Sequence, residues 1–359
     1  MILYVKGGVV LLNDTFNQLL ILSMYDKLTN TGQIHNVLTG RTTPSILFLV
    51  EINQWHHLYG VFPKLSRNSV EKLHRLYLDN HYIENADKKF HLTQKSKNYL
   101  KNNFSQFKEG SATFYTAEIL EDFWSLIRFV SQVISEKKYN NKQYIPHRDD
   151  LTSQLFVKYL LKENEEIENK WFKEQYQIFE WMSEDESLLL ANSLTGHQQN
   201  GLTLDQIARI QKVTVGKIYF NKLNAINNFV NNIFKSKNLV LHHKVIEEIL
   251  SRHDYGLTSS AYQTLKLLSE NFSIKEIARI KYVKVSTIKE HILEIAFKLP
   301  EVELTYLVPD EAKKILSNYF NKTENRHFKD MAEQISDLEF YQYRLIEIEW
   351  IRKVNKNER

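Results

Sequence analysis

The sequence predicts a mainly α-helical fold in which β structure is confined to one short hairpin. Only 10 glycines and 5 prolines occur in 359 residues, which favours helices joined by short loops. Apolar residues recur at helical spacing through most of the chain. One helical pattern also occurs twice, with an offset of 70 residues, as is typical of two copies of one folded unit.

The composition excludes several classes of function. The chain has no cysteine, so disulfides, thiolate nucleophiles and cysteine-ligated metal sites are excluded. The net charge of +4 is too small to indicate a partner. Polar residues interrupt the apolar N-terminal segment, and no apolar run reaches the ~18 residues of a membrane span. We therefore expect a cytoplasmic protein with no signal peptide and no membrane contact.

Residues 1–109 predict a winged-helix-like N-terminal domain. An apolar stripe at helical spacing indicates one helix, at Leu12, Phe16, Leu19 and Leu20, and Pro44 begins another. A further helix is expected from about Asn68 to Leu78, with inward-facing side chains at Val70, Leu73 and Leu76.

The wing is predicted from two β-prone runs, His81–Ile83 and Phe90–Leu92, which flank the turn-rich segment 84–87. Thr93 is expected to cap the helix that follows. From Lys64 to Glu109, ten Lys/Arg face five Asp/Glu, a net +5 that suits phosphate contacts. The candidate DNA-contacting residues are Arg67, Lys72 and Arg75. The alternative is a solvated face that is used for protein contacts.

Residues 110–187 predict a helical connector. Two apolar stripes are expected in it: Phe123, Trp124, Ile127 and Val130, then Leu155, Tyr159 and Leu160. From Lys162 to Glu186, nine acidic residues face three basic ones, a net −6 that would repel DNA. Its aromatic residues are either anchors for a protein partner or the connector's own core: Trp171, Phe172, Tyr176, Phe179 and Trp181.

Two helix-turn-helix domains are predicted, at 188–258 and 259–352, before a polar tail at 353–359. LTLDQIARIQKVTVGKI (202–218) aligns without gaps with FSIKEIARIKYVKVSTI (272–288), and the apolar positions recur. From Leu202 to Lys235 the first copy carries five basic residues and one acidic, a net +4. Its candidate DNA-binding residues are Lys217, Tyr219 and Lys222.

The second copy contains the residues that a helix-turn-helix requires. Ser273 and Glu276 form a capping-box pattern, and Ser286 is expected to cap the third helix. With isoleucines 288, 292 and 295 inward, the outward face would hold Thr287, Lys289, Glu290, His291 and Glu294. The candidate DNA-binding residues are Lys284, Ser286, Thr287, Lys289 and His291. The alternative is a three-helix packing unit with no special function.

Motifs for chemistry are lacking in the sequence. It has no G-x-x-x-x-G-K-[ST], no G-x-G-x-x-G and no H-E-x-x-H. His147-Arg148-Asp149-Asp150 is a weak candidate for nuclease-like metal binding. We therefore expect that the protein is not an enzyme, binds no cofactor, and has no catalytic or metal-binding residue.

The segment FSIKEIARIKYVKVSTIKEHI, the Val308-Pro309 helix start and ISDLEFYQYRLIEI resemble the C-terminal helix-turn-helix module of some RecQ-type helicases. With GRTTPSILFLVEINQWHHLYGVFPKLSR, the whole chain resembles the bacterial YpbB family, stand-alone proteins encoded beside a RecQ-like helicase. The resemblance implies a non-enzymatic DNA-binding accessory protein that acts with such a helicase in replication or repair. The alternative is a helix-turn-helix transcription regulator, which usually needs a dimerisation element for two half-sites.

Overall fold

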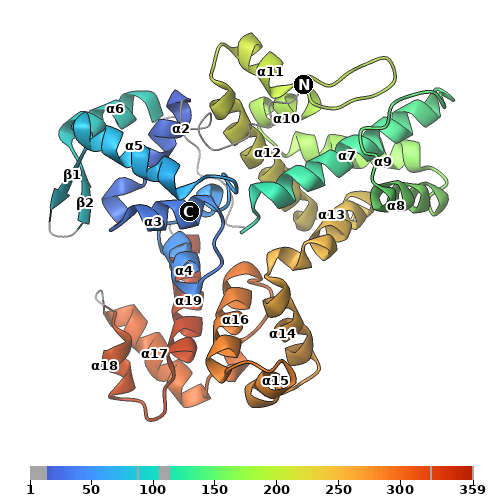
Figure 1. The fold of residues 1–359 in the computed structure, drawn as a ribbon. Helices are drawn as coiled ribbons and strands as arrows, with labels where there is room; N and C mark the ends of the chain where they lie inside the picture. The colour runs from blue at the N-terminus through green and yellow to red at the C-terminus, as the bar shows by residue number, and fades with distance from the viewer. Residues whose placement is uncertain (1–13, 87–88, 105–113, 324–325, 358–359) are drawn as a thin grey trace. The chain divides into compact units, whose positions relative to one another are not determined.

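The computed structural model in Figure 1 describes residues 14–86, 89–104, 114–323 and 326–357. They form two compact units: the first contains the described residues up to Gly40 with His57–Arg252, and the second contains Arg41–His56 with the residues from His253 onward. Among these described residues the only sheet has two strands, and helices dominate. The predicted mainly α-helical fold with a small hairpin is confirmed. The predicted four-domain division stays a prediction.

The N-terminal part of the first unit surrounds a short hairpin with helices. Its elements are α2 (Thr15–Leu22), the 3-10 helix η1 (Tyr25–Lys27), α3 (Thr31–Leu38), α5 (Arg67–Asp79), β1 (Ile83–Ala86), β2 (Lys89–Leu92) and α6 (Gln94–Phe104). α5 packs on α3 and buries Val70, Leu73 and Tyr77. Leu76, expected inward, is exposed, because the inward position one helical turn after Leu73 falls on Tyr77.

The hairpin is antiparallel, with Ile83 opposite Leu92 and Glu84 opposite His91. The prediction that the first strand covers His81–Ile83 is wrong. His81 has a φ of 53°, which is not extended, so the strand begins only at Ile83. The Leu92 N–H donates to the Asp26 carboxylate at 2.6 Å, which anchors the hairpin beside η1. Residues 84–86, predicted as turn, belong to β1, and residue 87 of the predicted turn lies outside the described residues.

The connector consists of α7 (Ala117–Lys138), α8 (Leu151–Lys162) and α9 (Ile167–Glu180), and α13 (Val240–Arg252) packs on α7 and α9. The predicted stripe of α7 is buried. The predicted stripe of α8 is wrong at Leu155 and Tyr159, which are more than half exposed. Ser153 and Val157 occupy the inward face there together with Leu160.

The first helix-turn-helix copy consists of α10 (Glu184–Ala191), α11 (Leu204–Gln211) and α12 (Val215–Lys235). Leu189, Ile207, Ala208 and Ile218 form its small core. α12 also packs on α2, α7, α9 and α13, so it is the central helix of the first unit.

The second unit is built around α16 (Val285–Lys298), which Figure 1 shows between α14 (Ser259–Ser269) and α19 (Phe340–Asn357). α15 (Ile274–Ile280) and α4 (Pro44–Ile52) also pack on α16. The remaining elements are the 3-10 helices η3 (Asp254–Gly256) and η4 (Thr305–Leu307), α17 (Asp310–Lys322) and α18 (Phe328–Ala332); a further 3-10 helix, η2, spans His56–Leu58. α19 continues to Asn357, so the predicted polar tail is helical, and not frayed, over residues 353–357.

The two helix-turn-helix copies have the same turn geometry at the same offset of 70 residues. Both bracing helices begin with a capping box, at Thr203 in one copy and Ser273 in the other. Both turns contain one left-handed residue, Lys212 with φ 54° and Tyr282 with φ 52°. In both, the next N–H donates to the alanine carbonyl, Val213 to Ala208 at 3.1 Å and Val283 to Ala278 at 3.0 Å. The repeat predicted from the sequence is therefore a structural repeat.

Candidate nucleic-acid interface

The first turn of α16 is the exposed part of the second copy's third helix. Lys284 is its N-cap, makes no side-chain capping hydrogen bond, and is exposed, as is Ser286. The expectation that Ser286 caps this helix is wrong, because the helix already begins at Val285. The end of α16 thus has an exposed lysine, an exposed hydroxyl and backbone N–H groups without a side-chain cap, and helix N-termini of this kind bind anions.

Beyond this first turn α16 is enclosed. Every residue from His291 to Leu299 is buried, because α14, α15, α19 and α4 surround the helix. The expectation that His291 and Glu294 face outward is therefore wrong. His291 Nδ1 lies 2.9 Å from Thr264 Oγ1, and burial lowers the pKa of His291 to about 4.

Glu294 has a structural role that removes it from the outward face. Its carboxylate accepts from the Thr258 N–H at 2.6 Å and from the Thr258 hydroxyl at 2.9 Å, which holds the start of α14. Of the two acidic residues expected on the outward face, only Glu290 is exposed. Thr287 and Lys289 are half-buried, and Lys289 pairs with Glu339 of the same unit.

Two exposed cations on α15, Lys275 and Arg279, were not among the residues predicted from the sequence, and they precede the predicted Lys284, which follows the turn. Lys275 and Lys284 have no ion-pair partner among the described residues. Glu276 is adjacent to Lys275 in sequence, and its carboxylate is held by Ser273 in the capping box; the acid nearest to Lys284 in sequence is the exposed Glu290. Because Ile277 and Ala278 form the buried face of α15, Lys275 and Arg279 lie on its exposed face. This exposure could have been predicted from the apolar spacing in the sequence.

The corresponding end of α12 in the first copy is closed. The Asp14 carboxylate accepts from the Gly216 N–H at 2.8 Å and from the Thr214 hydroxyl at 3.0 Å. Thr214 and Gly216 correspond to Lys284 and Ser286 of the second copy. An anionic group therefore already occupies, in the first copy, the position that is open in the second.

The first copy's candidate residues are dispersed. Lys222, expected on the presented face, is instead buried and its ammonium group pairs with Glu121 at 2.7 Å. That expectation is wrong because α7 packs against this side of α12. Tyr219 is half-buried, and its hydroxyl donates to the Val61 carbonyl at 3.4 Å. Lys217 is half-buried.

The helix before the wing presents a separate basic face. Arg67, Lys72 and Arg75 are all exposed on α5, as predicted. Arg67 pairs with Glu71 at 3.2 Å, four residues along the same helix. Lys72 and Arg75 have no ion-pair partner within the described residues, so both charges are available to a ligand.

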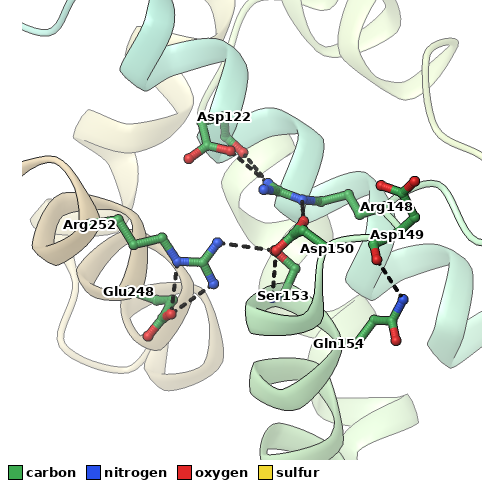
Figure 2. Close-up of polar contacts among 8 residues, drawn as sticks. All are labelled: Asp122, Arg148, Asp149, Asp150, Ser153, Gln154, Glu248 and Arg252. Atoms are coloured by element: carbon green, nitrogen blue, oxygen red, sulfur yellow. Dashed lines mark hydrogen bonds and ion pairs between the residues drawn. The ribbon is translucent and has the colours of Figure 1, made fainter.

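The acidic cluster after His147 serves the fold, as Figure 2 shows. Asp150 caps α8 by accepting from the Ser153 N–H at 2.8 Å, and Arg148 joins Asp150 to Asp122. Burial alone would raise the pKa of Asp150, but these bonds hold it at about 2. No group of three metal-ligating side chains occurs within the part of the chain that the structure describes. The cluster gives no support to the metal-binding alternative.

The aromatic residues of α9 divide between core and surface. Trp171 is fully buried, stacks on His242 and donates to Ser131 Oγ at 3.0 Å. Phe172, Tyr176 and Trp181 are exposed. The core alternative therefore holds for Trp171, and the partner-anchor alternative stays a prediction for the three exposed residues. Among the described helices, none combines the length and apolar character of a membrane span.

Comparison with known proteins identifies one matching domain family and one similar protein. Residues 260–347 match a family described as a helix-turn-helix domain. Protein YpbB of Bacillus subtilis (strain 168) is 24% identical over 228 residues, which is 62% of this chain and 63% of YpbB. The chain thus spans less than two thirds of that relative. No solved structure matches significantly. The resemblance to the YpbB family, and the helix-turn-helix module within it, are confirmed.

Proposed function

We propose that this chain, a helix-turn-helix protein similar to YpbB, is a non-enzymatic DNA-binding accessory protein that acts with a RecQ-like helicase in replication or repair. The observation that carries DNA binding is the open first turn of α16. Lys284 and Ser286 are exposed there, within the residues that match the helix-turn-helix family. Recognition helices contact DNA mainly through their N-terminal residues, so burial of the rest of α16 is compatible with this role.

The contacts that we propose are mostly to phosphates. Lys284, Ser286, Thr287 and Lys289 would contact one stretch of backbone, with Lys289 released from Glu339 by the competing anion. Arg67, Lys72 and Arg75 on α5 would make a second set of contacts beside the wing. We leave out Lys222 and His291, because both are buried. Lys217 and Tyr219 remain secondary candidates, because Asp14 closes the adjacent helix end.

DNA binding is tested by titrating duplex DNA at several salt concentrations. Lys284→Ala should weaken binding and flatten the log–log salt slope by about 0.9, the value for one phosphate contact on duplex DNA. Lys314→Ala removes the same charge from the exposed surface of α17 and is the matched control. If both variants bind as the parent does, α16 is not the DNA-contacting helix. If the parent shows no binding that depends on salt, the proposed function fails.

The helicase partner rests on the family resemblance and on the exposed side of α9. Phe172 and Tyr176 lie four residues apart on this helix, with Trp181 just beyond its end, in a segment of net negative charge. Aromatic side chains are frequent anchors in interfaces, which usually bury about 1,200–2,000 Å². Because acidic residues surround these aromatic side chains, we expect the partner's contacting surface to be basic.

Co-purification with the RecQ-like helicase from the same organism tests this partnership. The double change Phe172→Ala with Tyr176→Ala should abolish co-purification and leave melting unchanged. Tyr306→Ala, which alters an exposed tyrosine of the second unit, is the control and should still co-purify. Trp171 is unsuitable for this test, because its replacement would destabilise the core. Sequence-specific binding to a palindromic operator, without co-purification, would favour the transcription regulator instead.

A further inference from the structure

Tyr282 is an aromatic side chain held in the open at the tip of the second helix-turn-helix. Its relative exposure is 95%, and its φ of 52° is unusual for a bulky residue. The backbone is fixed on both sides, because the Tyr282 N–H donates to the Arg279 carbonyl at 3.2 Å and the Val283 N–H to Ala278. A ring with no packing role thus stands on a rigid turn.

Positive charge flanks the ring. Arg279 lies three residues before Tyr282 and Lys284 two residues after it, and both are exposed. Lys281 is not available to a ligand, because its ammonium group is bound to Ser260 and Thr264. From residue 275 to 284 four basic residues face one acidic residue, a net +3, and that acid is engaged in a capping box.

The first copy shows what the turn needs for folding. Lys212 occupies the equivalent position with nearly the same φ, 54°, and its turn makes the same hydrogen bonds. The fold therefore does not require an aromatic residue there. The same ten positions, 205–214, carry two basic residues and one acidic residue, a net +1, and Arg209 is paired with Asp205 at 2.7 Å. Of the two copies, only the second combines an exposed aromatic ring with a strongly positive turn.

We propose that Tyr282 is a stacking platform for an unpaired base, so that this site takes single-stranded DNA next to a duplex. This inference rests on the proposed DNA-binding function. Every base presents a π-face, and an aromatic ring between backbone-contacting cations is how single-strand binders hold bases without reading sequence. In a closed duplex the bases are already stacked on one another, so the ring gains a partner only where a strand is open. A broad apolar surface would favour a protein, but in this turn the exposed apolar neighbour is the single side chain Ile280.

The test compares a forked DNA with a blunt duplex of the same length. Tyr282→Ala should weaken fork binding about 5-fold or more, the typical loss of one stacked base, and change duplex binding less than about 2-fold. Tyr282→Phe, which keeps the π-face, should bind the fork as the parent does. 2-Aminopurine in the single-stranded arm, next to the junction, should lose fluorescence on binding to the parent and to Tyr282→Phe, but not to Tyr282→Ala. Tyr306→Ala is the matched control on the same unit.

The outcomes separate this inference from the proposed function. If Tyr282→Ala binds forks and quenches 2-aminopurine as the parent does, the stacking platform is excluded, while dependence of duplex binding on Lys284 would leave DNA binding intact. If the parent binds no DNA, the proposed function fails and this inference fails with it. If Tyr282→Ala loses only the helicase, the ring contacts protein and the inference is overturned. Because the side chain contacts almost nothing, each variant should melt as the parent does.

Discussion

The Asp14 carboxylate accepts a hydrogen bond from the backbone N–H of Gly216 at 2.8 Å, although the two residues are 202 positions apart. The same carboxylate caps α2, accepting from the Phe16 N–H at 2.9 Å. One anionic side chain thus satisfies two helix N-termini, where the backbone dipoles favour negative charge. The glycine is needed, because a Cβ at position 216 would lie 2.6 Å from the Asp14 carboxyl group.

A double-mutant cycle at these two positions should show strong coupling. Asp14→Ala should lower the free energy of unfolding by about 1–2 kcal/mol, the usual effect of losing a cap. Gly216→Ala should cost about 1–3 kcal/mol in the parent, because the new methyl group meets the carboxylate. In the Asp14→Ala background the same change should be neutral or stabilising, since alanine is the better helix former. Denaturant unfolding measures all three differences.

The control for this cycle is Ser286→Ala, at the equivalent position of the open copy. It should change the free energy of unfolding by no more than about 0.5 kcal/mol, as most exposed substitutions do. Additive effects of Asp14→Ala and Gly216→Ala would contradict the direct contact.

Arg352 and Glu51 form an ion pair between α19 and α4 in the second unit. The guanidinium group contacts both carboxylate oxygens, each at 3.1 Å, and also donates to the carbonyls of Ala296 and Phe297. Burial alone would raise the pKa of Glu51. The hydrogen bond from His56 and the charge of Arg352 outweigh burial and hold that pKa below its ordinary value of 4.5.

Arg352→Met should lower the free energy of unfolding by about 3–5 kcal/mol, because it removes the guanidinium partner of the buried Glu51 carboxylate, which then keeps its contact with His56. Replacing both residues, Glu51→Leu with Arg352→Met, should cost less than the single change, because no buried charge remains. Since the pKa of Glu51 is lowered on folding, its contribution is present above pH 4.5 and is lost as the pH falls below that value. Chemical denaturation at pH 7 and pH 4 measures both effects; a double variant as unstable as Arg352→Met would contradict the account.

The sequence predicts those features that depend on local periodicity. The repeat was found because Ile207, Ala208 and Ile218 recur as Ile277, Ala278 and Ile288, and all six are buried in the structure. The capping box of Ser273 and Glu276 was predicted for the same reason, since the two residues lie within one turn of each other. The hairpin was predicted from its turn residues, but its first strand begins two residues and ends three residues later than predicted.

The errors occur where a distant segment covers a helix face. Periodicity identifies one apolar face of α16, but α4, from much earlier in the chain, packs on this helix as well. His291 and Glu294 are polar residues that burial requires to be bonded, and their partners Thr264 and Thr258 have no sequence signal. Lys222 was assigned outward for the same reason, since nothing near it in sequence indicates that Glu121 pairs with it.

Acidification should destabilise the second unit through His291. Burial and the nearby charge of Lys281 lower the pKa of His291 from 6.5 to about 4. Between these two values the unfolded chain binds a proton that the native chain does not, so stability falls as the pH falls from 6.5 to 4. His291→Gln, which cannot titrate, should show a shallower fall in melting temperature over this range.

His147 in the first unit has its pKa lowered to about 4 for the same physical reason, and it is present in both proteins. Its contribution to the pH dependence therefore cancels in the comparison of His291→Gln with the parent. Equal slopes for the two proteins would show that His291 is accessible to protons in the native state.

The basic face of α5 should contribute to DNA affinity without contributing to stability. Lys72 and Arg75 are exposed and have no ion-pair partner in the part of the chain that the structure describes. Lys72→Ala with Arg75→Ala should therefore leave melting unchanged and flatten the salt slope on duplex DNA by about 1.8, two contacts of about 0.9 each. Lys158→Ala with Lys162→Ala removes the same charge from α8 and controls for net charge. An equal change in slope for both double variants would assign the effect to net charge and exclude a contact by α5.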